Sequence, residues 1–441
     1  MFTDRSLPAL LIAALAACPL LAQTHPRLAG DIRADMPELL RIYKHLHANP
    51  ELSYQEAETA RFVAADLRGL GFDVTENVGG YGVVGVLRNG TGPTLMIRTD
   101  LDALPVVEQT GLPFASTVTA TEQNGQEVGV MHACGHDVHM TALLGTARRL
   151  AHARLEWRGT LMMIGQPAEE RGGGAKAMLA DGLFERFPRP DFNLAMHVSA
   201  ALPAGRIAAT PGFALASVDS VDITVHGIGG HGAYPHTTRD PVVLASQIVI
   251  ALQTIVSRET SPLEPAVVTV GSFNAGAKHN VISDRADLQL TVRTYNDEVR
   301  RRILDSIERI AINLGRAAGL PEDRLPEVRV LDESLPSTYN DPELARRAAD
   351  AISSQLGEGA LIEAAPVMGA EDFSLYGRVE PRIPSLMLWA GAVEPGRWRA
   401  ARESGEILPS LHSPFFAPDY DSVIPTGVEA MTAAALELLK R

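Results

Sequence analysis

The chain has 441 residues, of which 46% are apolar and 21% charged, a composition typical of a folded globular protein that excludes an intrinsically disordered one. Because domains usually span roughly 100 to 200 residues, the length predicts two or three domains and excludes a small disulfide-stapled module. The 53 Asp and Glu residues outnumber the 39 Lys and Arg residues, so we expect no nucleic acid among the partners of this protein.

An uncharged run rich in Leu and Ala, Leu7–Ala22, follows Arg5 near the start of the chain. Because this run is short for a bilayer span, we interpret residues 1–22 as a secretory signal peptide and not as a stable transmembrane segment, and we expect a periplasmic or secreted protein. In one alternative, Leu15-Ala16-Ala17-Cys18 is a lipobox and Cys18 carries a lipid anchor; in another, the run packs on the body of the protein as an apolar helix. Cys134 would be the only cysteine of a soluble mature chain, which excludes an internal disulfide.

Helix-like and strand-like segments alternate through residues 24–212. In chain order we expect a helical region at 35–70, strands at 72–74, 83–87 and 94–98, a helix at 140–153, a strand at 160–165, a helix at 175–183 and a strand at 192–196. This alternation predicts an α/β fold in which helices cover the faces of a sheet.

A second unit begins near Phe213 and has a different order of elements. We expect strands at 219–226, 267–273, 287–295 and 328–331, and helices at 240–258 and 297–318. The order β-α-β-β-α-β is that of ferredoxin-like domains. A helix at 342–355, a strand at 385–389 and a helix at 426–439 follow, so we expect residues 213–335 to be an α+β domain inserted into an α/β domain made of 24–212 and 336–441.

Polar residues suited to catalysis follow three of the expected buried strands. Asp100 and Asp102 come after the strand at 94–98, Glu169 and Glu170 after that at 160–165, and His197 after that at 192–196. In open α/β sheets, ligands bind beyond the carboxyl ends of the strands. We therefore expect these acids and this histidine to lie together at one edge of the sheet.

A cysteine and three histidines lie between Met131 and His139. Cys134 and His136 are two residues apart and can face one ion, and the start of the following helix favours an anionic thiolate. Thiolate, imidazole and carboxylate ligands together suit zinc and its first-row neighbours. On an extended segment, Glu169 and Glu170 would point in opposite directions, so that one holds metal while the other takes the proton of a metal-bound water. Each residue taken alone is more often an ordinary polar residue, so the hypothesis of a metal site depends on their occurring together.

Other chemistries have less support in this sequence. It contains no G-x-S-x-G nucleophile elbow, no H-E-x-x-H zincin helix and no G-x-x-x-x-G-K-[ST] phosphate loop. The run Gly172–Ala177 fits G-x-G-x-x-A, but two acids and an arginine separate it from the preceding strand, where a pyrophosphate needs bare backbone. An oxidoreductase that uses a dinucleotide is therefore a remote alternative.

Five motifs resemble those of metal-dependent amidohydrolases. They are Arg98–Pro105 (RTDLDALP), Met131–His139 (MHACGHDVH), Gln166–Glu170 (QPAEE), Gly229–His236 (GGHGAYPH) and Leu411–Phe415 (LHSPF). The resemblance is to the branch that contains hippurate hydrolase, N-acyl-amino-acid amidohydrolases and auxin-conjugate (IAA-amino acid) hydrolases, within the aminoacylase and glutamate carboxypeptidase superfamily. It covers nearly all of the chain after the expected signal peptide.

The resemblance implies a phosphorylase/aminopeptidase-like α/β catalytic domain with two divalent metal ions, and an inserted lid domain through which two chains form a homodimer. By matched motif, the metal ligands would be Cys134, His136, Glu170, His197 and His412, and the general base would be Glu169. We expect zinc first, with manganese, cobalt or nickel as alternatives. Other members of the superfamily have His-x-Asp where this chain has Arg98-Thr99-Asp100, so Arg98 cannot bind metal, Cys134 compensates, and Asp100 would orient a ligand.

Three residues of the lid also match family positions. His231 corresponds to a histidine that reaches a neighbouring active site and polarises the scissile carbonyl. Asn280 and Arg293 match positions that hold the substrate carboxylate, a task suited to a guanidinium group; otherwise, Asn280 could cap a turn and Arg293 could lie on an exposed strand face. Glu371-Asp372-Phe373 resembles a further family motif, to which we assign no role.

The sequence thus predicts an exported hydrolase that cleaves the amide bond of an N-acyl or N-aroyl amino acid and releases a carboxylic acid and a free amino acid. A metal-bound water would be the nucleophile, Glu169 the general base and acid, and His231 the group that stabilises the oxyanion. A metallo-dipeptidase or carboxypeptidase acting on short peptides is the alternative within the same class; it would need an acidic partner for the free α-amine of its substrate. A non-catalytic periplasmic binding or metal-carrier protein on the same scaffold is the alternative from another class.

Overall fold

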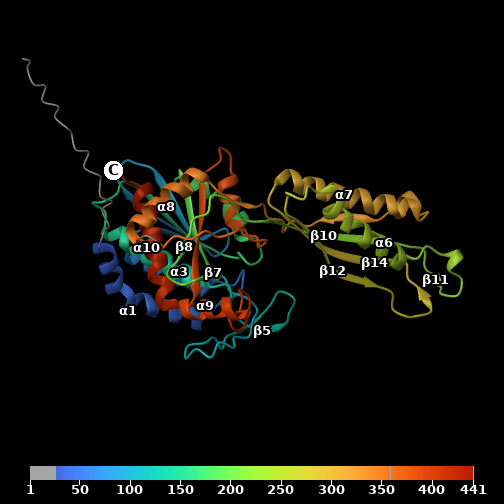
Figure 1. Ribbon diagram of the computed structural model, residues 1–441, viewed down its shortest axis with the longest axis horizontal. Helices are drawn as coiled ribbons and strands as arrows, with labels where there is room; N and C mark the ends of the chain where they lie inside the picture. Colours follow the sequence, from blue (N-terminus) through green and yellow to red (C-terminus); the bar gives the residue numbers. More distant parts are fainter. Residues whose placement is uncertain (1–25, 358, 441) are drawn as a thin grey trace, which may run out of the picture.

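The computed structural model describes residues 26–357 and 359–440, so the expected signal peptide and Cys18 lie outside the described residues. The described chain forms two parts. The larger part contains a seven-stranded sheet, and the smaller, elongated part projects from it; we call the smaller part, Ser217–Val330, the lid (Figure 1).

The central sheet is mixed, with parallel strands in its middle. Its order is β1 (Asp73–Val78), β2 (Gly82–Asn89), β6 (Gly159–Gln166), β3 (Thr94–Asp100), β7 (Phe192–Pro203), β17 (Ser385–Val393) and β8 (Ile207–Ala208). The inner strands β6, β3, β7 and β17 are parallel, whereas β1, β2 and β8 join by antiparallel pairing. Parallel strands are buried on both faces, which explains why β3 reads as a nearly continuous apolar run.

Helices cover both faces of this sheet. Alternate residues of each strand therefore pack into two separate cores, one on each face. On β3, Leu95 and Ile97 face one core and Met96 faces the other. The first core is built with α1 (Pro26–Ala48), α2 (Ala57–Gly69), α3 (His136–His152), α8 (Pro342–Leu356) and α10 (Tyr420–Leu438). The second is built with α4 (Gly174–Ala180), α5 (Leu183–Arg186) and the 3-10 helix η4 (Asp372–Arg378). The predicted α/β class, with helices on both sheet faces, is confirmed.

The lid has the predicted order of elements, β-α-β-β-α-β. Its antiparallel sheet has the order β12 (Ala266–Ala275), β14 (Arg285–Thr294), β10 (Ser217–His226) and β15 (Glu327–Val330). Helices α6 (Pro241–Thr254) and α7 (Asp297–Ala317) pack on one face of this sheet. The short helices η1 (Pro235–Thr237) and η3 (Glu322–Arg324) complete the lid, and β9 (Gly212–Leu215) pairs with β16 (Thr338–Asn340) where the chain enters and leaves it.

Helix α6 continues into the π-helical turn η2 (Ile255–Glu259). Within the described residues, Pro241–Glu259 is the one helix long and apolar enough to cross a membrane by length and composition. Core helices of globular proteins meet the same criterion, and here Leu244, Ile248 and Leu252 pack against the lid sheet. At the far end of the lid, β11 (Gly230–His231) pairs with β13 (Val281–Ile282) (Figure 1).

The helical region expected at 35–70 is helical but interrupted, since it forms two helices, α1 and α2, separated by residues 49–56. Pro50 lacks an N–H and disfavours a helical conformation of Asn49. The Glu51 carboxylate then accepts hydrogen bonds from the backbone N–H groups of Glu58 (3.2 Å) and Thr59 (2.7 Å) at the start of α2. The sequence also did not predict the short elements β4 (Thr119–Thr121), β5 (Glu127–Gly129), η4 and α9 (Pro395–Ser404).

Candidate metal centre and active site

The register of the parallel strands brings predicted site residues into one row. Asp100 at the end of β3 pairs with Gln166 of β6, and the register of β3 with β7 aligns Arg98 with Ala195, so Asp100 is level with His197. The sequence predicts that His197 follows its strand. It lies within β7 instead, because β7 continues to Pro203. The predicted convergence at one sheet edge is nevertheless observed.

The remaining predicted ligands reach this edge from loops, except His136, which is the first residue of α3. Cys134 lies just before α3, and the loop that carries His412 is held beside it, because the N–H of His412 donates to the carbonyl oxygen of Ala133 (2.9 Å). The Sγ of Cys134 is 3.3 Å from the Nε2 of His412 and 3.6 Å from the Nε2 of His197. The Oε1 of Glu170 is 3.5 Å from the Nε2 of His412 and 3.8 Å from that of His136. The structure thus brings Cys134, His136, Glu170, His197 and His412 into one cluster, in which overlapping groups of three have donor atoms within 4.8 Å of one another.

The donor atoms of this cluster suit divalent cations. The Nε2 of His136 and the Oε1 of Glu170 are buried and lack a hydrogen-bond partner among the described residues. The Nδ1 of His136 lies 2.8 Å from the carbonyl oxygen of Asp102, and that of His197 lies 2.7 Å from the carbonyl oxygen of Val198. A backbone carbonyl can only accept, so each Nδ1 carries a proton, and once the rings are neutral each Nε2 turns its lone pair toward the cluster. A thiol, imidazoles and a carboxylate are ligands that zinc and its neighbours prefer.

Burial and neighbouring charges perturb these groups in the chain without bound metal. Burial alone would lower the pKa of His136, but the carboxylates of Asp100 and Asp102 raise it to about 10. Burial raises the pKa of Glu170 to about 7. Burial, together with the charge of Glu170, also raises the pKa of Cys134 well above its ordinary value, so the expectation that the helix start favours the thiolate is wrong for the metal-free chain. Ligands must lose these protons to bind metal, so cations and protons compete for the cluster.

Glu169 and Glu170 lie in a turn after β6 and not on an extended segment, so their expected opposite orientation is wrong in detail. Both carboxylates approach the Nε2 of His136, at 4.0 Å for Glu169 and 3.8 Å for Glu170. They then diverge, because Glu170 faces Cys134 and His412, whereas Glu169 faces Glu371 and Asp372. Burial and the negative charge of Glu371 raise the pKa of Glu169 well above its ordinary value.

A buried ion-pair network lies behind Glu169 and is centred on Arg98. The guanidinium group of Arg98 donates to Asp100 (2.8 Å), Glu371 (2.8 Å) and Asp372 (2.9 Å), and its Nε donates to the side-chain oxygen of Gln166 (2.9 Å). The motif that contains Glu371 and Asp372, to which sequence reasoning assigned no role, thus supplies two of the partners of Arg98.

Asp100 contacts His139, which sequence reasoning did not single out. The Oδ1 of Asp100 accepts from the Nδ1 of His139 (2.8 Å), and the Nε2 of His139 accepts from the backbone N–H of Val198 (2.9 Å), the residue that follows His197. The Oδ2 of Asp100 is 3.7 Å from the Nε2 of His136. The position of His139 within the Met131–His139 motif was the available signal.

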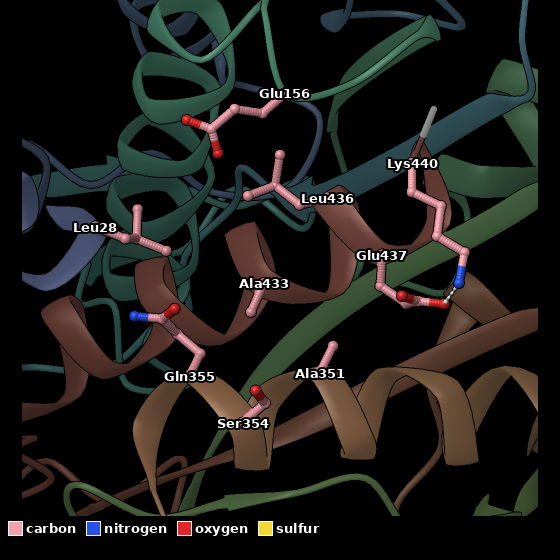
Figure 2. A pocket seen from close by; sticks show the side chains of 9 residues that line it. All are labelled: Leu28, Glu156, Ala351, Ser354, Gln355, Ala433, Leu436, Glu437 and Lys440. Carbon is pink, nitrogen blue, oxygen red and sulfur yellow. Dashed lines mark hydrogen bonds and ion pairs between the residues drawn. The ribbon is translucent and has the colours of Figure 1, made fainter. Parts of the chain in front are cut away.

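A cleft of about 450 Å³ opens onto the cluster. Its apolar wall contains Leu215, Leu335, Val367, Trp389 and Leu411. Its polar lining includes Glu333 and, from the lid, Arg293. Arg293 is half-buried and donates to the carbonyl oxygen of Met368 (2.7 Å). A separate cavity of about 420 Å³ between α8 and α10, beside the ion pair of Glu437 and Lys440, contains none of the predicted site residues (Figure 2).

The structure does not place His231 and Asn280 in this cleft. Both lie at the far tip of the lid, where the N–H of Gly232 donates to the carbonyl oxygen of Asn280 (3.0 Å). Strand β14 runs from Arg285 near that tip to Arg293 at the cleft, which at roughly 3.4 Å per residue is about 27 Å. The Nδ1 of His231 accepts from the N–H of Ala233 (3.0 Å), so its exposed Nε2 carries the proton of the neutral ring.

Comparison with known proteins identifies the family of this chain. The family model described as peptidase family M20/M25/M40 matches residues 96–437. Thermostable carboxypeptidase 1 of Saccharolobus solfataricus is 37% identical, covering 93% of this chain and 98% of its own. The hippurate hydrolase of Campylobacter jejuni is 38% identical, covering 77% of this chain and 85% of its own. The solved structure of Bacillus subtilis YxeP, described as a dinuclear metal-binding peptidase from the M20 family, has a TM-score of 0.73 and 30% identity, covering 92% of this chain and 99% of its own.

Proposed function

The chain belongs to peptidase family M20/M25/M40, and we propose that it is a metal-dependent amidohydrolase that cleaves the amide bond of N-acyl or N-aroyl amino acids. One observation carries this proposal: the donor atoms of Cys134, His136, Glu170, His197 and His412 converge beside a buried carboxylate, Glu169. The similarity to a hippurate hydrolase supports the substrate class.

We propose that these five side chains hold two divalent cations, as the similarity to a dinuclear metal-binding protein suggests. When bound, such cations supply Lewis acidity, which polarises an amide carbonyl and makes water acidic enough to attack near neutral pH. Zinc fits a site with a cysteine ligand, and manganese, cobalt and nickel are the alternatives. Elemental analysis of the purified protein decides among them and gives the number of ions per chain.

Glu169 is the proposed general base and acid. It accepts a proton from water as the water oxygen bonds to the amide carbon, and it passes that proton to the nitrogen as the C–N bond breaks. The products are a carboxylic acid and a free amino acid. Its burial and the nearby Glu371 support this role, because they raise the pKa of the carboxyl group and so make the carboxylate a stronger base than an exposed glutamate.

The cleft supports the proposed substrate class. Its apolar wall, with Trp389 and Leu335, suits an acyl or aroyl group, and the guanidinium group of Arg293 suits the substrate carboxylate. Asp100 is proposed to position a ligand through His139, since the other nitrogen of that ring fixes the backbone beside His197.

We propose that His231 and Asn280 act on the active site of a second chain in a homodimer formed through the lid. His231 presents a ring N–H at the exposed tip, where it can donate to an oxyanion that its own cleft cannot offer. Two features support pairing between lids. Val243 and Ile250 of α6 are 55% and 72% exposed, and among the described strands β12 pairs with β14 alone, which leaves its other edge open.

The experiment that tests the function is release of free amino acid from a panel of N-acetyl, N-benzoyl and indoleacetyl amino acids together with dipeptides. Metal-loaded wild type, chelator-treated protein and Glu169→Gln are compared. We expect turnover of the blocked substrates that chelator abolishes and metal restores. Absence of turnover across the panel, with metal still bound, would contradict the proposal and favour a non-catalytic binding or metal-carrier protein.

A carboxypeptidase or dipeptidase acting on short peptides is a second candidate, because one relative is named a carboxypeptidase and Glu333 lines the cleft. A carboxylate in that position can pair with a free α-amine. Faster turnover of dipeptides than of the matching N-acetyl amino acids, lost in Glu333→Gln, would favour this candidate.

We also propose that the protein is exported, on the strength of the uncharged run Leu7–Ala22. Mass spectrometry of the mature protein tests this proposal. Cleavage after Ala22 supports a soluble exported form, a lipid-modified Cys18 supports an anchored form, and an intact leader contradicts both.

A further inference from the structure

A short segment, Ser53–Glu56, lies against the turn that carries Glu169 and Glu170. Its last residue, Glu56, is fully buried, and its Oε1 accepts hydrogen bonds from the backbone N–H groups of Tyr54 (2.9 Å) and Ala168 (2.8 Å). Ala168 directly precedes Glu169. A buried carboxylate therefore holds the backbone on one side of the proposed general base.

Asp102 holds the backbone on the other side of the same residue. Its Oδ2 accepts hydrogen bonds from the N–H of Glu170 (3.0 Å) and from the hydroxyl of Ser53 (2.6 Å). Asp102 is also fully buried. The amides of Ala168 and Glu170 are thus each bound by a carboxylate; the first carboxylate belongs to the segment Ser53–Glu56, and the second accepts a hydrogen bond from it.

The turn between these two contacts has a backbone conformation that does not persist without support. Ala168 has a φ of +48°, in the left-handed region that residues with a Cβ disfavour, and Tyr54 has a φ of +67°. The carbonyl oxygen of Ala168 accepts from the N–H groups of Gly173 and Gly174, each at 3.2 Å. If the Ala168 peptide rotated out of this conformation, the directions of the following side chains would change with it, and Glu169 would leave its place between His136 and Glu371.

We propose that Glu56 is a positioning residue, which holds the Ala168 amide so that the left-handed turn directs Glu169 and Glu170 to their different neighbours. The inference rests on the proposed amide hydrolysis for its kinetic consequence. The hydrogen bonds of Glu56 are to backbone amides, so it acts through the backbone.

The proposed role of Glu56 requires its hydrogen-bond acceptor and not its charge. Burial and the nearby Asp102 raise the pKa of Glu56 to about 7, so an amide in its place resembles the protonated carboxyl group. Glu56→Gln keeps an oxygen for the Ala168 N–H, and Glu56→Leu fills the same volume without an acceptor. Glu56→Asp keeps a polar carboxylate but draws it back by one methylene group.

Glu51 provides a matched control. Its carboxylate also accepts from two backbone N–H groups, those of Glu58 and Thr59, but these belong to α2 and not to the catalytic turn. Glu51→Leu therefore removes a comparable pair of hydrogen bonds from the same region. A loss of thermal stability without a change in kcat is expected for this variant.

The kinetic test measures kcat and KM for the best substrate of the panel. We expect Glu56→Leu to lower kcat by about 100-fold, because small displacements of a catalytic group have effects of that size, with KM changed by less than about threefold. Glu56→Gln should stay within about fivefold of wild type, and Glu56→Asp should lie between the two. The inference is overturned if Glu56→Leu keeps wild-type kcat, if Glu56→Gln falls as far as Glu56→Leu, or if Glu51→Leu loses kcat equally.

A second readout does not depend on turnover. Co²⁺ is titrated into the metal-free wild type and the four variants, and its visible absorption spectrum reports the ligands around the ion. We expect Glu56→Leu to change the spectrum most clearly and Glu56→Asp less, because Glu170 shifts with the turn, while Glu56→Gln and Glu51→Leu match wild type. An altered cobalt spectrum without hydrolysis by any form would reject the proposed function and keep the positioning role; identical spectra in all forms, with unchanged kcat, would reject the positioning role.

Discussion

His47 is buried between two carboxylates, and this arrangement makes the stability of the protein depend on pH. Its Nδ1 is 2.6 Å from Asp137 in the first turn of α3, and its Nε2 is 3.0 Å from Glu108. All three side chains are at most 1% exposed. Since both ring nitrogens face acceptors, the ring carries two protons and a positive charge. Burial alone would lower its pKa, but Asp137 and Glu108 raise it from 6.5 to about 10.

The size and sign of the effect follow from this shift. At about 1.36 kcal/mol per pKa unit, a rise from 6.5 to about 10 corresponds to a stabilisation on the order of 5 kcal/mol. This stabilisation is fully present below pH 6.5, where the folded and unfolded chains both hold the proton. It is lost as the pH rises toward 10, because only the folded chain still holds the proton in that interval. The free energy of unfolding should therefore fall by about 1.4 kcal/mol per pH unit between about pH 7 and 9.5 from His47 alone.

Urea unfolding of wild type and His47→Gln in the presence of chelator measures this slope. All three tryptophans of the chain, Trp157, Trp389 and Trp398, lie outside the lid, so their fluorescence reports the part that contains His47. We expect the variant to lose the His47 contribution to the slope, so that the two curves converge near pH 10. His45→Gln, at an exposed position on the same helix, is the control and should keep the wild-type slope. Parallel curves for wild type and His47→Gln would refute a protonated His47 in the folded protein.

Three further variants test the site. Glu169→Gln should lower kcat by about 10³-fold with metal content unchanged, and a loss below tenfold would contradict its role as general base. His231→Ala and Glu169→Gln should each be weakly active alone and regain about a quarter of wild-type activity when they are unfolded together and refolded. About half of the dimers are then mixed, and one of the two sites in each mixed dimer is intact. No gain would contradict action of His231 between chains. Arg98→Met should lower the free energy of unfolding in urea by about 3–5 kcal/mol, since it leaves Asp100, Glu371 and Asp372 without their cation, and an unchanged value would contradict that dependence.

Local sequence patterns predicted the fold because burial leaves a periodic signal. The apolar run of β3 and the alternation of β10 each depend on neighbours in sequence, and the polar residues after such strands meet at one edge by the geometry of parallel sheets. What the sequence did not predict are contacts between residues far apart in the chain. His47 meets Asp137 across 90 positions and Glu56 meets Ala168 across 112, and neither pair produces a period or a motif.

The interruption between α1 and α2 was not predicted for a related reason, since it depends on contacts with distant parts of the chain. The segment between α1 and α2 lies within the region predicted to be helical, but it contains Pro50 and ends in Glu56. Its departure from helical geometry is what allows Tyr54 to adopt a left-handed conformation and Glu56 to turn toward Ala168. Interruptions of this kind occur where tertiary contacts override local preference, and such contacts are concentrated at functional sites.

The charges around Arg98 leave excess negative charge at this edge of the sheet. One guanidinium group offsets one negative charge, yet Asp100, Glu371 and Asp372 all contact it, and Glu169 lies within reach of the last two. Protonated His136 lies beside this excess negative charge, and its raised pKa is one expression of the same imbalance. Burial and this crowding also raise the pKa of Asp372 to about 7 and that of Glu169 well above its ordinary value. Arg98 therefore does not replace a metal ligand. It neutralises part of an acidic pocket, and the remaining negative charge is available to bind either protons or divalent metal.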